Sequence, residues 1–400
     1  MLPTLLLMLA APPADWPSFR GANGDGDAGS AAIPTKWSDT ENVRWKVPVK
    51  GKGWASPLIL GDQVWLSSAT EDGKQKFALG FDRATGKLLH DVELFPEAKP
   101  AFSHAFNSYA SCTGALEPGR FYAHFGSHGT ACLDTATGKI LWTRDDFKCD
   151  HWRGPASSVA LHGDRLFLLF DGHDLQYVVA LNKRTGETLW KTDRDIKYSR
   201  DDGDLKKAYA TPKLIVANGR EELICPAAES TISYDPATGK ELWRVNHGGM
   251  NGSARPLFVD GVLYLTSGHN QNLLAVKPGG EVLWKQTREV PTRPSLVAAN
   301  GLLFMVDDKG LARCLDAKTG REKWKERLGG EYSASPIHAN GNIYFCDQDG
   351  RTHVVAAADT FTSVGTNRLP GGFMASPSVA GDVLFLRTRT HLYAIANQGR

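Results

Sequence analysis

The sequence predicts an all-β protein, an eight-bladed β-propeller built from four-stranded antiparallel blades. Two phrases alternate along the chain, and each reads as strand, tight turn, strand. The last copy lacks one strand, and an N-terminal segment resembles the strand that is missing. A repeat of about 40 to 55 residues that holds four short strands is typical of a propeller.

The first phrase is a hairpin that occurs six times. An apolar run ends, in five of the copies, at an Asp or Asn whose side chain can accept hydrogen bonds from the next backbone amides, and a glycine follows that can adopt positive φ. The copies are FDRATGKLLHDVEL, LDTATGKILWTRD, LNKRTGETLWKTD, YDPATGKELWRVN, VKPGGEVLWKQT and LDAKTGREKWKERL, and the turn glycines of five are Gly86, Gly138, Gly186, Gly239 and Gly320.

The second phrase is a small residue, then Ser or Thr, often Pro, and then an alternating strand that breaks at a Gly, Asp or Asn turn. It begins at Ala55, Ala110, Ala156, Ala210, Ala254, Arg293, Ala334 and Ala375. One such phrase with the hairpin that follows gives four strands. The count of eight phrases therefore predicts eight blades.

The chain after Ala375 provides three strands and then ends, so the eighth blade lacks its outer strand. Residues 42–49, NVRWKVPV, fit that place, because Trp45 matches the tryptophans of the other outer strands: Trp142, Trp190, Trp243, Trp284 and Trp324. We expect this N-terminal strand to close the ring and remove the open edge. We interpret the repeated tryptophan as structural, since one large ring per blade buries apolar area between sheets.

The residues before the propeller divide into two segments. Residues 1–14 contain a seven-residue apolar run, Leu5 to Ala11, followed by small residues and proline, which is typical of a secretory signal peptide and too short to span a bilayer. No cysteine follows that run, so a lipid anchor is not indicated. Residues 15–41 show no strand pattern, and we expect an ordered arm over the ring, pinned by Trp16, Phe19 and Trp37. The propeller then covers residues 42–400, and the predicted location is periplasmic or extracellular.

Composition excludes several functions. The chain has 46 basic and 44 acidic residues, a net charge of +2, which gives no electrostatic surface for nucleic acid. Its six cysteines are scattered without a CxxC, so no metal cluster is predicted; Cys132 and Cys314 occupy equivalent strand positions and read as buried apolar residues. The sequence has no nucleophile elbow, HExxH or phosphate-binding glycine loop, so no catalytic residues are assigned. We expect a monomer.

Strand direction assigns the loops to two faces. The short GD, NG and TGK turns lie on one face, here called the bottom, and the longer loops that enter each inner strand lie on the opposite, top face. Long loops on a rigid scaffold are where function is found. We expect a ligand-binding funnel at the mouth of the ring, formed by Trp54, His104, Asn107, His151, Trp152, Arg153, Tyr209, His247, Asn251, Arg255, Arg293 and Tyr332. Arginine in such a funnel suits a planar anion such as a carboxylate. Loops between second and third strands add His128, His173 and His269 to the same face, which we interpret as polar turn residues.

The TGKxLW hairpin with its ASP-led inner strand resembles the repeat of the PQQ-like (pyrroloquinoline quinone) propellers, which include quinoprotein dehydrogenases and BamB-like proteins. The DWPSFRGANGDG opening also resembles secreted PQQ-like repeat proteins of planctomycete-type bacteria, most without an assigned activity. The resemblance covers residues 42–400 and implies shape more than chemistry.

Departures from the family set the functional expectation. Quinoprotein dehydrogenases carry adjacent cysteines over the cofactor, and this chain has none. We therefore expect a non-catalytic binding or scaffold module whose top face engages a protein, a carbohydrate or a small anionic ligand. Two alternatives stay open: a quinoprotein oxidoreductase using PQQ with calcium, and a BamB-like envelope assembly factor.

Overall fold

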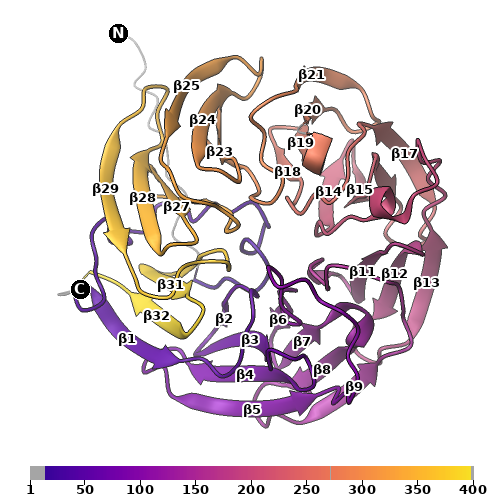
Figure 1. Ribbon diagram of the computed structural model, residues 1–400, viewed down its shortest axis with the longest axis horizontal. Helices are drawn as coiled ribbons and strands as arrows, with labels where there is room; N and C mark the ends of the chain where they lie inside the picture. Colours follow the sequence, from indigo (N-terminus) through magenta and orange to yellow (C-terminus); the bar gives the residue numbers. More distant parts are fainter. Residues whose placement is uncertain (1–13, 271, 398–400) are drawn as a thin grey trace.

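A computed structural model describes residues 14–270 and 272–397, and it confirms the predicted eight-bladed propeller. Eight four-stranded antiparallel sheets stand around a central channel (Figure 1). The strands of blades 1 to 4 are β2 (Leu58–Leu60), β3 (Gln63–Ala69), β4 (Lys76–Asp82), β5 (Leu88–Leu94); β6 (Ala115–Glu117), β7 (Arg120–His124), β8 (Thr130–Asp134), β9 (Ile140–Arg144); β10 (Ala160–His162), β11 (Arg165–Asp171), β12 (Gln176–Asn182), β13 (Thr188–Asp193); and β14 (Lys213–Ala217), β15 (Arg220–Pro226), β16 (Ser230–Tyr234), β17 (Glu241–Asn246).

Blades 5 to 8 repeat the pattern, and three short helical turns interrupt the loops. The strands are β18 (Leu257–Val259), β19 (Val262–Thr266), β20 (Leu273–Val276), β21 (Val282–Gln286); β22 (Val297–Ala299), β23 (Leu302–Val306), β24 (Leu311–Asp316), β25 (Glu322–Arg327); β26 (Ile337–Ala339), β27 (Asn342–Cys346), β28 (Arg351–Ala356), β29 (Ser363–Arg368); and β30 (Ser378–Ala380), β31 (Val383–Arg387), β32 (His391–Ile395), β1 (Val43–Pro48). The turns are η1 (Gly126–His128), η2 (Gly203–Lys206) and η3 (Gly268–Asn270).

The N-terminal strand closes the ring as predicted. β1 pairs antiparallel with β32, with Trp45 opposite Ala394. The pairing continues past both ends of β1, where the amide of Val49 donates to the carbonyl of Thr390 at 2.9 Å. The first and last strands thus share one blade, so the ring has no open seam.

In five blades the hairpin turn is built by an Asp or Asn and closed by a glycine. In blade 1 the Asp82 carboxylate accepts from the amide of Thr85 at 2.8 Å, and Gly86 has a φ of 73°. A Cβ on Gly86 would lie 2.7 Å from the Trp45 ring of blade 8, so the turn requires glycine for steric reasons as well. The Trp45 Nε1 donates to the carbonyl of Arg83 at 2.9 Å. The repeated Trp and the repeated turn therefore form one contact between neighbouring blades.

Most of the other outer-strand tryptophans make the same contact with the next blade. Their Nε1 groups donate to carbonyls at 3.0–3.1 Å in the pairs Trp142–Lys183, Trp190–Pro236, Trp284–Ala317 and Trp324–Ala358. Trp243 instead donates to the buried carboxylate of Glu222 at 2.6 Å. The structural interpretation of the repeated Trp is confirmed.

A belt of hydroxyl groups joins the inner strands around the channel. The Ser or Thr hydroxyl of one blade accepts a hydrogen bond of 2.9–3.0 Å from the equivalent backbone amide of the blade before it. The amide–hydroxyl pairs are Ser56–Thr113, Thr113–Ser158, Ser158–Thr211, Arg255–Ser295, Ser295–Ser335 and Ser335–Ser376. The predicted phrase places the hydroxyl directly after its first residue. In blades 2, 3 and 6 the hydroxyl that accepts the bond lies one or two residues further along the chain. At blade 5 the position is Arg255, which has no hydroxyl to accept from Thr211.

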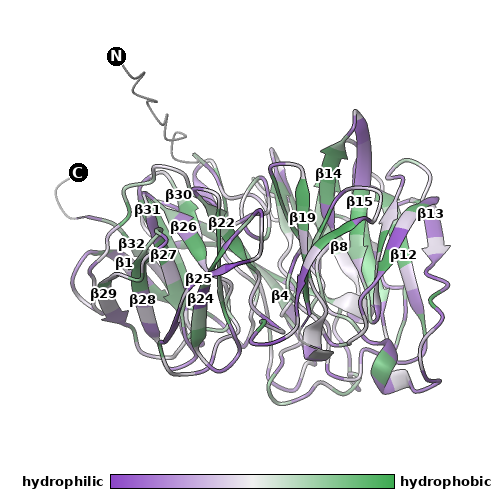
Figure 2. Cartoon of the chain, turned by 90° about the horizontal axis from the view of Figure 1, so that it is seen from above, coloured by the Kyte–Doolittle hydropathy of each residue, from purple (hydrophilic) through white to green (hydrophobic). Residues whose placement is uncertain are grey.

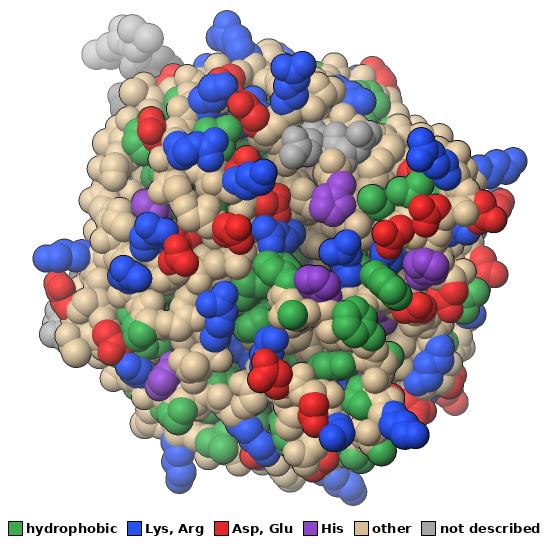
Figure 3. Space-filling view, viewed as in Figure 1, with side chains coloured by type: hydrophobic (Ala, Val, Ile, Leu, Met, Phe, Trp, Pro, Cys, Tyr) green, Lys and Arg blue, Asp and Glu red, His purple; other side chains and the backbone are tan. Residues whose placement is uncertain are grey.

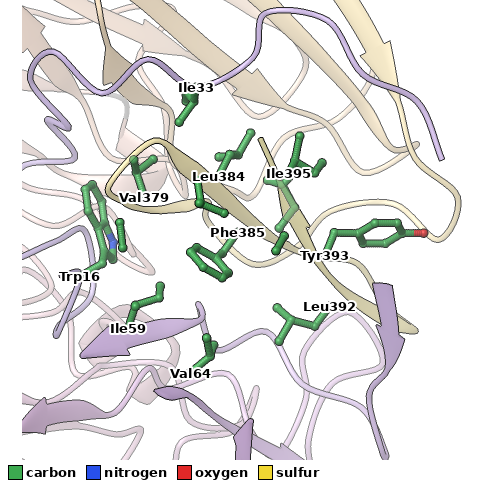
Figure 4. Packing of buried hydrophobic residues seen from close by; sticks show 14 of the residues in the cluster. Trp16, Ile33, Ile59, Val64, Val379, Leu384, Phe385, Leu392, Tyr393 and Ile395 are labelled. Atoms are coloured by element: carbon green, nitrogen blue, oxygen red, sulfur yellow. The ribbon is translucent and has the colours of Figure 1, made fainter. Parts of the chain in front are cut away.

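Residues 16–27 of the arm lie inside the channel, on the inner edges of the blades, whereas residues 29–32 contact the bottom turns of blades 7 and 8 and Trp37 contacts the outer strand β29. Trp16 pairs with Ile59 of blade 1, Ser18 with Ala115 of blade 2, and Asp27 with His338 of blade 7. Since these strands face the channel from different sides, the arm must occupy its centre. Figure 4 shows Trp16 beside Ile59 and near the core residues of blade 8. Trp16 and Trp37 are buried as expected, while Phe19 is only half-buried.

Buried cations fix the arm to the propeller. The Arg20 guanidinium, 2% exposed, donates to the carbonyls of Asp25, Leu296 and Pro336 at 2.6–2.9 Å. Arg255 donates to the carbonyls of Phe19 and Pro212. Burial lowers the pKa of Arg20 to about 9 and that of Arg255 to about 10, so both stay charged at neutral pH. Backbone carbonyls therefore solvate these charges.

The remaining expectations concern cysteines and the membrane. All six cysteines are free and buried, which confirms the interpretation of Cys132 and Cys314 as core residues. Among the described residues, no helix is long and apolar enough to cross a bilayer. The predicted signal peptide lies, apart from Ala14, outside the described residues.

Candidate ligand-binding site on the top face

The top face carries a cavity at the mouth of the channel. The helical turns lie on this face, which is at the lower edge of Figure 2. Figure 3 looks onto it and shows a hollowed centre surrounded by hydrophobic, basic and histidine side chains. The cavity has a volume of about 520 Å³, within the usual range for small-molecule sites. A narrower space of about 120 Å³ continues inward past the hydroxyl belt to Phe19 of the arm.

Half of the predicted funnel residues line this cavity. They are His104, Asn107, Arg153, Tyr209, Asn251 and Arg293, from the loops that enter blades 2, 3, 4, 5 and 6. Loops far apart in sequence thus meet at one place, because each enters its inner strand from the top face.

The other six predicted residues do not line it. Trp54 borders the narrower inner space, and Trp152 is 49% exposed on the rim. His247 and Tyr332 are buried, and Arg255 holds the arm. His151 lies behind the cavity wall, where its Nε2 accepts from the amide of Ser127 at 3.0 Å and burial lowers its pKa to about 4.

Arg293 is organised by its neighbours. It forms an ion pair with Asp308, whose other carboxylate oxygen accepts from the amide of Thr292 at 2.7 Å. The guanidinium carbon also lies 4.5 Å from the centroid of the Phe106 ring. Both the charge and the flat face of Arg293 are therefore already in use.

Arg153 differs from Arg293 because its guanidinium has no hydrogen bond or ion pair with any described residue, and its Nε is buried. Its charge contributes to the low pKa of His269, second to the burial of that ring. His269 is consequently neutral at pH 7. The positive charge of the cavity comes from Arg153 and from the exposed Lys309, which likewise has no acidic partner within the described parts of the chain.

Three further residues shape the cavity. Asn251 is 7% exposed, has a φ of 57°, and its Oδ1 has no hydrogen-bond partner. His104 accepts from the amide of Phe106 at 3.2 Å through Nδ1, which leaves Nε2 for a ligand. Tyr209 donates its hydroxyl to the carbonyl of His151 at 3.0 Å and presents its ring. The cavity therefore offers a cation, donors, an acceptor and aromatic surface.

Eight residues that line the cavity were not among the predicted funnel residues: Phe106, Ala156, Ser253, His269, Thr292, Asp307, Asp308 and Lys309. His269 and Asp308 stand in equivalent loops between the second and third strands of blades 5 and 6. Their shared loop position could have predicted that His269 and Asp308 line the cavity, because these loops reach the same face. His128 and His173, in the corresponding loops of blades 2 and 3, do not line the cavity.

One Ser–His pair stands behind the cavity wall, and its contacts do not fit a nucleophile with its base. The Ser127 hydroxyl lies 3.0 Å from His151 Nε2, a distance that suits a nucleophile and its base. However, the Ser127 amide donates to the same ring nitrogen, and the hydroxyl is also 2.9 Å from the carbonyl of Cys149. The nitrogen is therefore already used as an acceptor.

The residues present do not fit PQQ with calcium either. Among the described residues, no group of three or more His, Cys, Asp or Glu side chains could hold a metal. Of the two carboxylates at the cavity, Asp308 is paired with Arg293, and Asp307 accepts from the amides of Lys309 and Leu311 at 2.9 and 2.8 Å. Calcium takes about six to eight oxygen ligands, several of them carboxylates, and of these two side chains only Asp307, at Oδ2, has a carboxylate oxygen without a hydrogen bond to a described residue.

The eight four-stranded blades and their repeated turns define a PQQ-like β-propeller, and the cavity lies at the mouth of its channel. The family model described as outer membrane protein assembly factor BamB matches residues 35–146 and 228–334, more than half of the chain. The chain belongs to this BamB-like family of PQQ-repeat propellers.

Relatives within reach of sequence comparison differ in function. The outer membrane protein assembly factor BamB of Yersinia pestis is 24% identical, over 77% of each chain. Tetrathionate hydrolase of Acidithiobacillus ferrooxidans is 28% identical, over 76% of this chain and 65% of its own length. Quinoprotein ethanol dehydrogenase of Pseudomonas aeruginosa is 29% identical, over 48% of this chain and 33% of its own length. The chain thus spans a third of that dehydrogenase.

Solved structures share the fold. BamB from Moraxella catarrhalis superimposes with a TM-score of 0.65 at 14% identity, covering 88% of this chain and 99% of BamB. A europium-containing methanol dehydrogenase gives a TM-score of 0.68 at 10% identity, covering 96% of this chain and 98% of the dehydrogenase. Such low identities carry the fold and not the chemistry.

Proposed function

We propose that this protein is an exported binding module that holds a ligand in its top-face cavity and performs no catalysis of its own. The observation that carries the proposal is the unpaired Arg153 beside the unpartnered Asn251 in a cavity of about 520 Å³. Buried polar groups in folded proteins nearly always have partners, so two such groups in one cavity indicate a bound molecule. The signal peptide (1–14), arm (15–41) and propeller (42–400) remain the proposed division.

A photo-crosslinking experiment tests this function. The phenylalanine analogue p-benzoylphenylalanine would replace Phe106 at the cavity and, as a control, Val216, which is 63% exposed on β14 toward the bottom turns. After irradiation in native cells, we expect mass-shifted adducts at position 106 and none at position 216. Adducts at neither position, or equally at both, would contradict a top-face binding function. Detection of the protein in the cytoplasm alone would contradict export.

A protein partner is the second candidate, because the rim of the cavity exposes aromatic rings. Phe102 is 63% exposed and Trp152 49%, with their ring centroids 6.0 Å apart. Exposed aromatic clusters mark interaction surfaces, and Trp is frequent among residues that dominate binding energy. The relatives named as outer membrane protein assembly factors support a protein partner at this rim. Replacing both rings with serine should then abolish protein adducts at position 106 while the protein stays folded.

A further inference from the structure

The cavity contains a hydrogen-bond acceptor with no donor. Neither side-chain atom of Asn251 has a hydrogen bond with a described residue, and Oδ1 is buried. Its backbone is held by the bond from its amide to the carbonyl of Lys207 at 2.9 Å, so the side chain is not free to turn to solvent with the loop. A buried carbonyl oxygen without a donor is unfavourable, and a ligand N–H or O–H would satisfy it.

The same cavity contains a cation without a direct ion pair: Arg153 helps to lower the pKa of Asp204, after the contribution of Lys207, but forms no ion pair with it. The Arg153 guanidinium faces neither Asp307 nor Asp308 in an ion pair, although both line the cavity. Asp308 is taken by Arg293, and Asp307 by backbone amides. An arginine in this situation fits a bidentate carboxylate from outside.

Hydroxyl groups and an aromatic ring complete the wall. The hydroxyls of Ser253 and Thr292 line the cavity without a hydrogen bond to any described residue. Phe106 is 38% exposed, with Arg293 packed on its ring. Paired donors and acceptors beside an aromatic ring match a molecule that carries several hydroxyl groups on a compact carbon frame.

We propose that the ligand of this cavity is a hydroxylated carboxylic acid of monosaccharide size, the class that includes the hexuronic acids. Its carboxylate would bind Arg153, and one hydroxyl would donate to Asn251 Oδ1. Further hydroxyls would meet Ser253 and Thr292, with the carbon frame against Phe106. The assignment rests on the proposed function, and it names the ligand class of the same site.

Calorimetric titration of the whole protein with three probes tests the assignment. Glucuronate has the carboxylate and the hydroxyls, glucose has hydroxyls without charge, and succinate has carboxylates without hydroxyls. We expect glucuronate to bind one to one and at least about tenfold more tightly than either of the others, because a charge-assisted bidentate contact is roughly twice as strong as a neutral one. Equal or weaker binding of glucuronate relative to glucose would overturn the proposal.

Two variants and a matched control locate the effect. Arg153→Gln should lower glucuronate affinity to the level of glucose and leave glucose unchanged. Asn251→Asp keeps a residue type that tolerates positive φ but sets a second carboxylate against the ligand, so glucuronate should bind at least about tenfold more weakly. Arg389→Gln removes an exposed cation from a neighbouring depression on the same face and should change nothing. The proposed site would be refuted if Arg389→Gln lost the preference for glucuronate over glucose, or if Arg153→Gln kept that preference.

The two proposals fail differently. Adducts at position 106 together with no selective binding of glucuronate would reject the ligand class and keep the binding function. Absence of adducts at position 106 in cells together with no selective binding of glucuronate would reject both.

Discussion

The lower channel and the top cavity both contain arginines, and their surroundings are opposite. Arg20 and Arg255 donate to backbone carbonyls of the arm and the inner strands. Arg153, at the cavity, has no partner among the described residues. The comparison shows that an arginine beside the channel is structural where backbone carbonyls accept its hydrogen bonds. Where no such carbonyls surround it, the guanidinium is available to a ligand.

Replacing Arg20 should cause the largest effect. Arg20→Met leaves three carbonyls in the channel without a donor, so we expect a loss of about 4 kcal/mol in the free energy of unfolding. Urea unfolding followed by tryptophan fluorescence measures it. Arg44→Met, at an exposed position, is the control and should stay within about 0.5 kcal/mol of the wild type. A stable Arg20→Met variant would mean that the arm is not anchored through this residue.

A pair of matched variants addresses the comparison directly. Arg255→Met should destabilise by about 3 kcal/mol, because the carbonyls of Phe19 and Pro212 lose their donor. Arg153→Met should change stability by less than about 0.5 kcal/mol, since no protein contact to the guanidinium is lost. Thermal unfolding of both proteins side by side is sufficient. Similar losses of stability in Arg255→Met and Arg153→Met would show that the two arginines do not differ in structural role.

Acid should weaken the wall behind the cavity. Burial lowers the pKa of His151 from 6.5 to about 4, so between these values the unfolded chain binds a proton that the folded protein excludes. Stability is therefore fully present above pH 6.5 and falls as the pH drops toward 4, by up to about 1.4 kcal/mol per pH unit. Denaturant midpoints at pH 7, 6 and 5 measure the slope. His151→Gln should reduce the slope without abolishing it, because burial also lowers the pKa of His124, to about 3. An unchanged slope would exclude a contribution from His151.

The hydroxyl belt should give the smallest effect. Ser335→Ala removes the acceptor of the Ser295 amide at 2.9 Å, and we expect a loss of about 1 to 2 kcal/mol. Ser253→Ala, in the cavity, removes a hydroxyl with no partner among the described residues and should be neutral. Equal melting temperatures for both variants would show that the belt adds nothing to stability.

The blades could be predicted from the sequence because each carries its own local signal. Asp82, Gly86 and Trp45 recur with fixed spacing in their equivalents, and each acts through a turn or a contact with the next blade. The path of the arm could not be predicted. Its Gly- and Asp-rich residues form isolated bridges to several blades, and no periodicity records contacts between residues 16 and 59 or 27 and 338.

The candidate site was predicted only in part, for a related reason. Position in an entering loop correctly brought His104, Arg153 and Asn251 to one cavity. It also included Arg255, and the break in the phrase there, Ala-Arg-Pro instead of Ala-Ser-Pro, indicates its separate role. Whether a side chain in such a loop faces the cavity or the blade behind it depends on packing between blades, which one sequence does not record.

The arm that fills the lower channel determines how anything can move through the ring. Because Phe19 borders the narrower inner space, we expect a ligand in the cavity to enter and leave through the mouth on the top face. A partner seated on the rim at Phe102 and Trp152 would cover that mouth. If both proposals hold, docking on the top face would compete with exchange of the ligand, and the rate of one would limit the other.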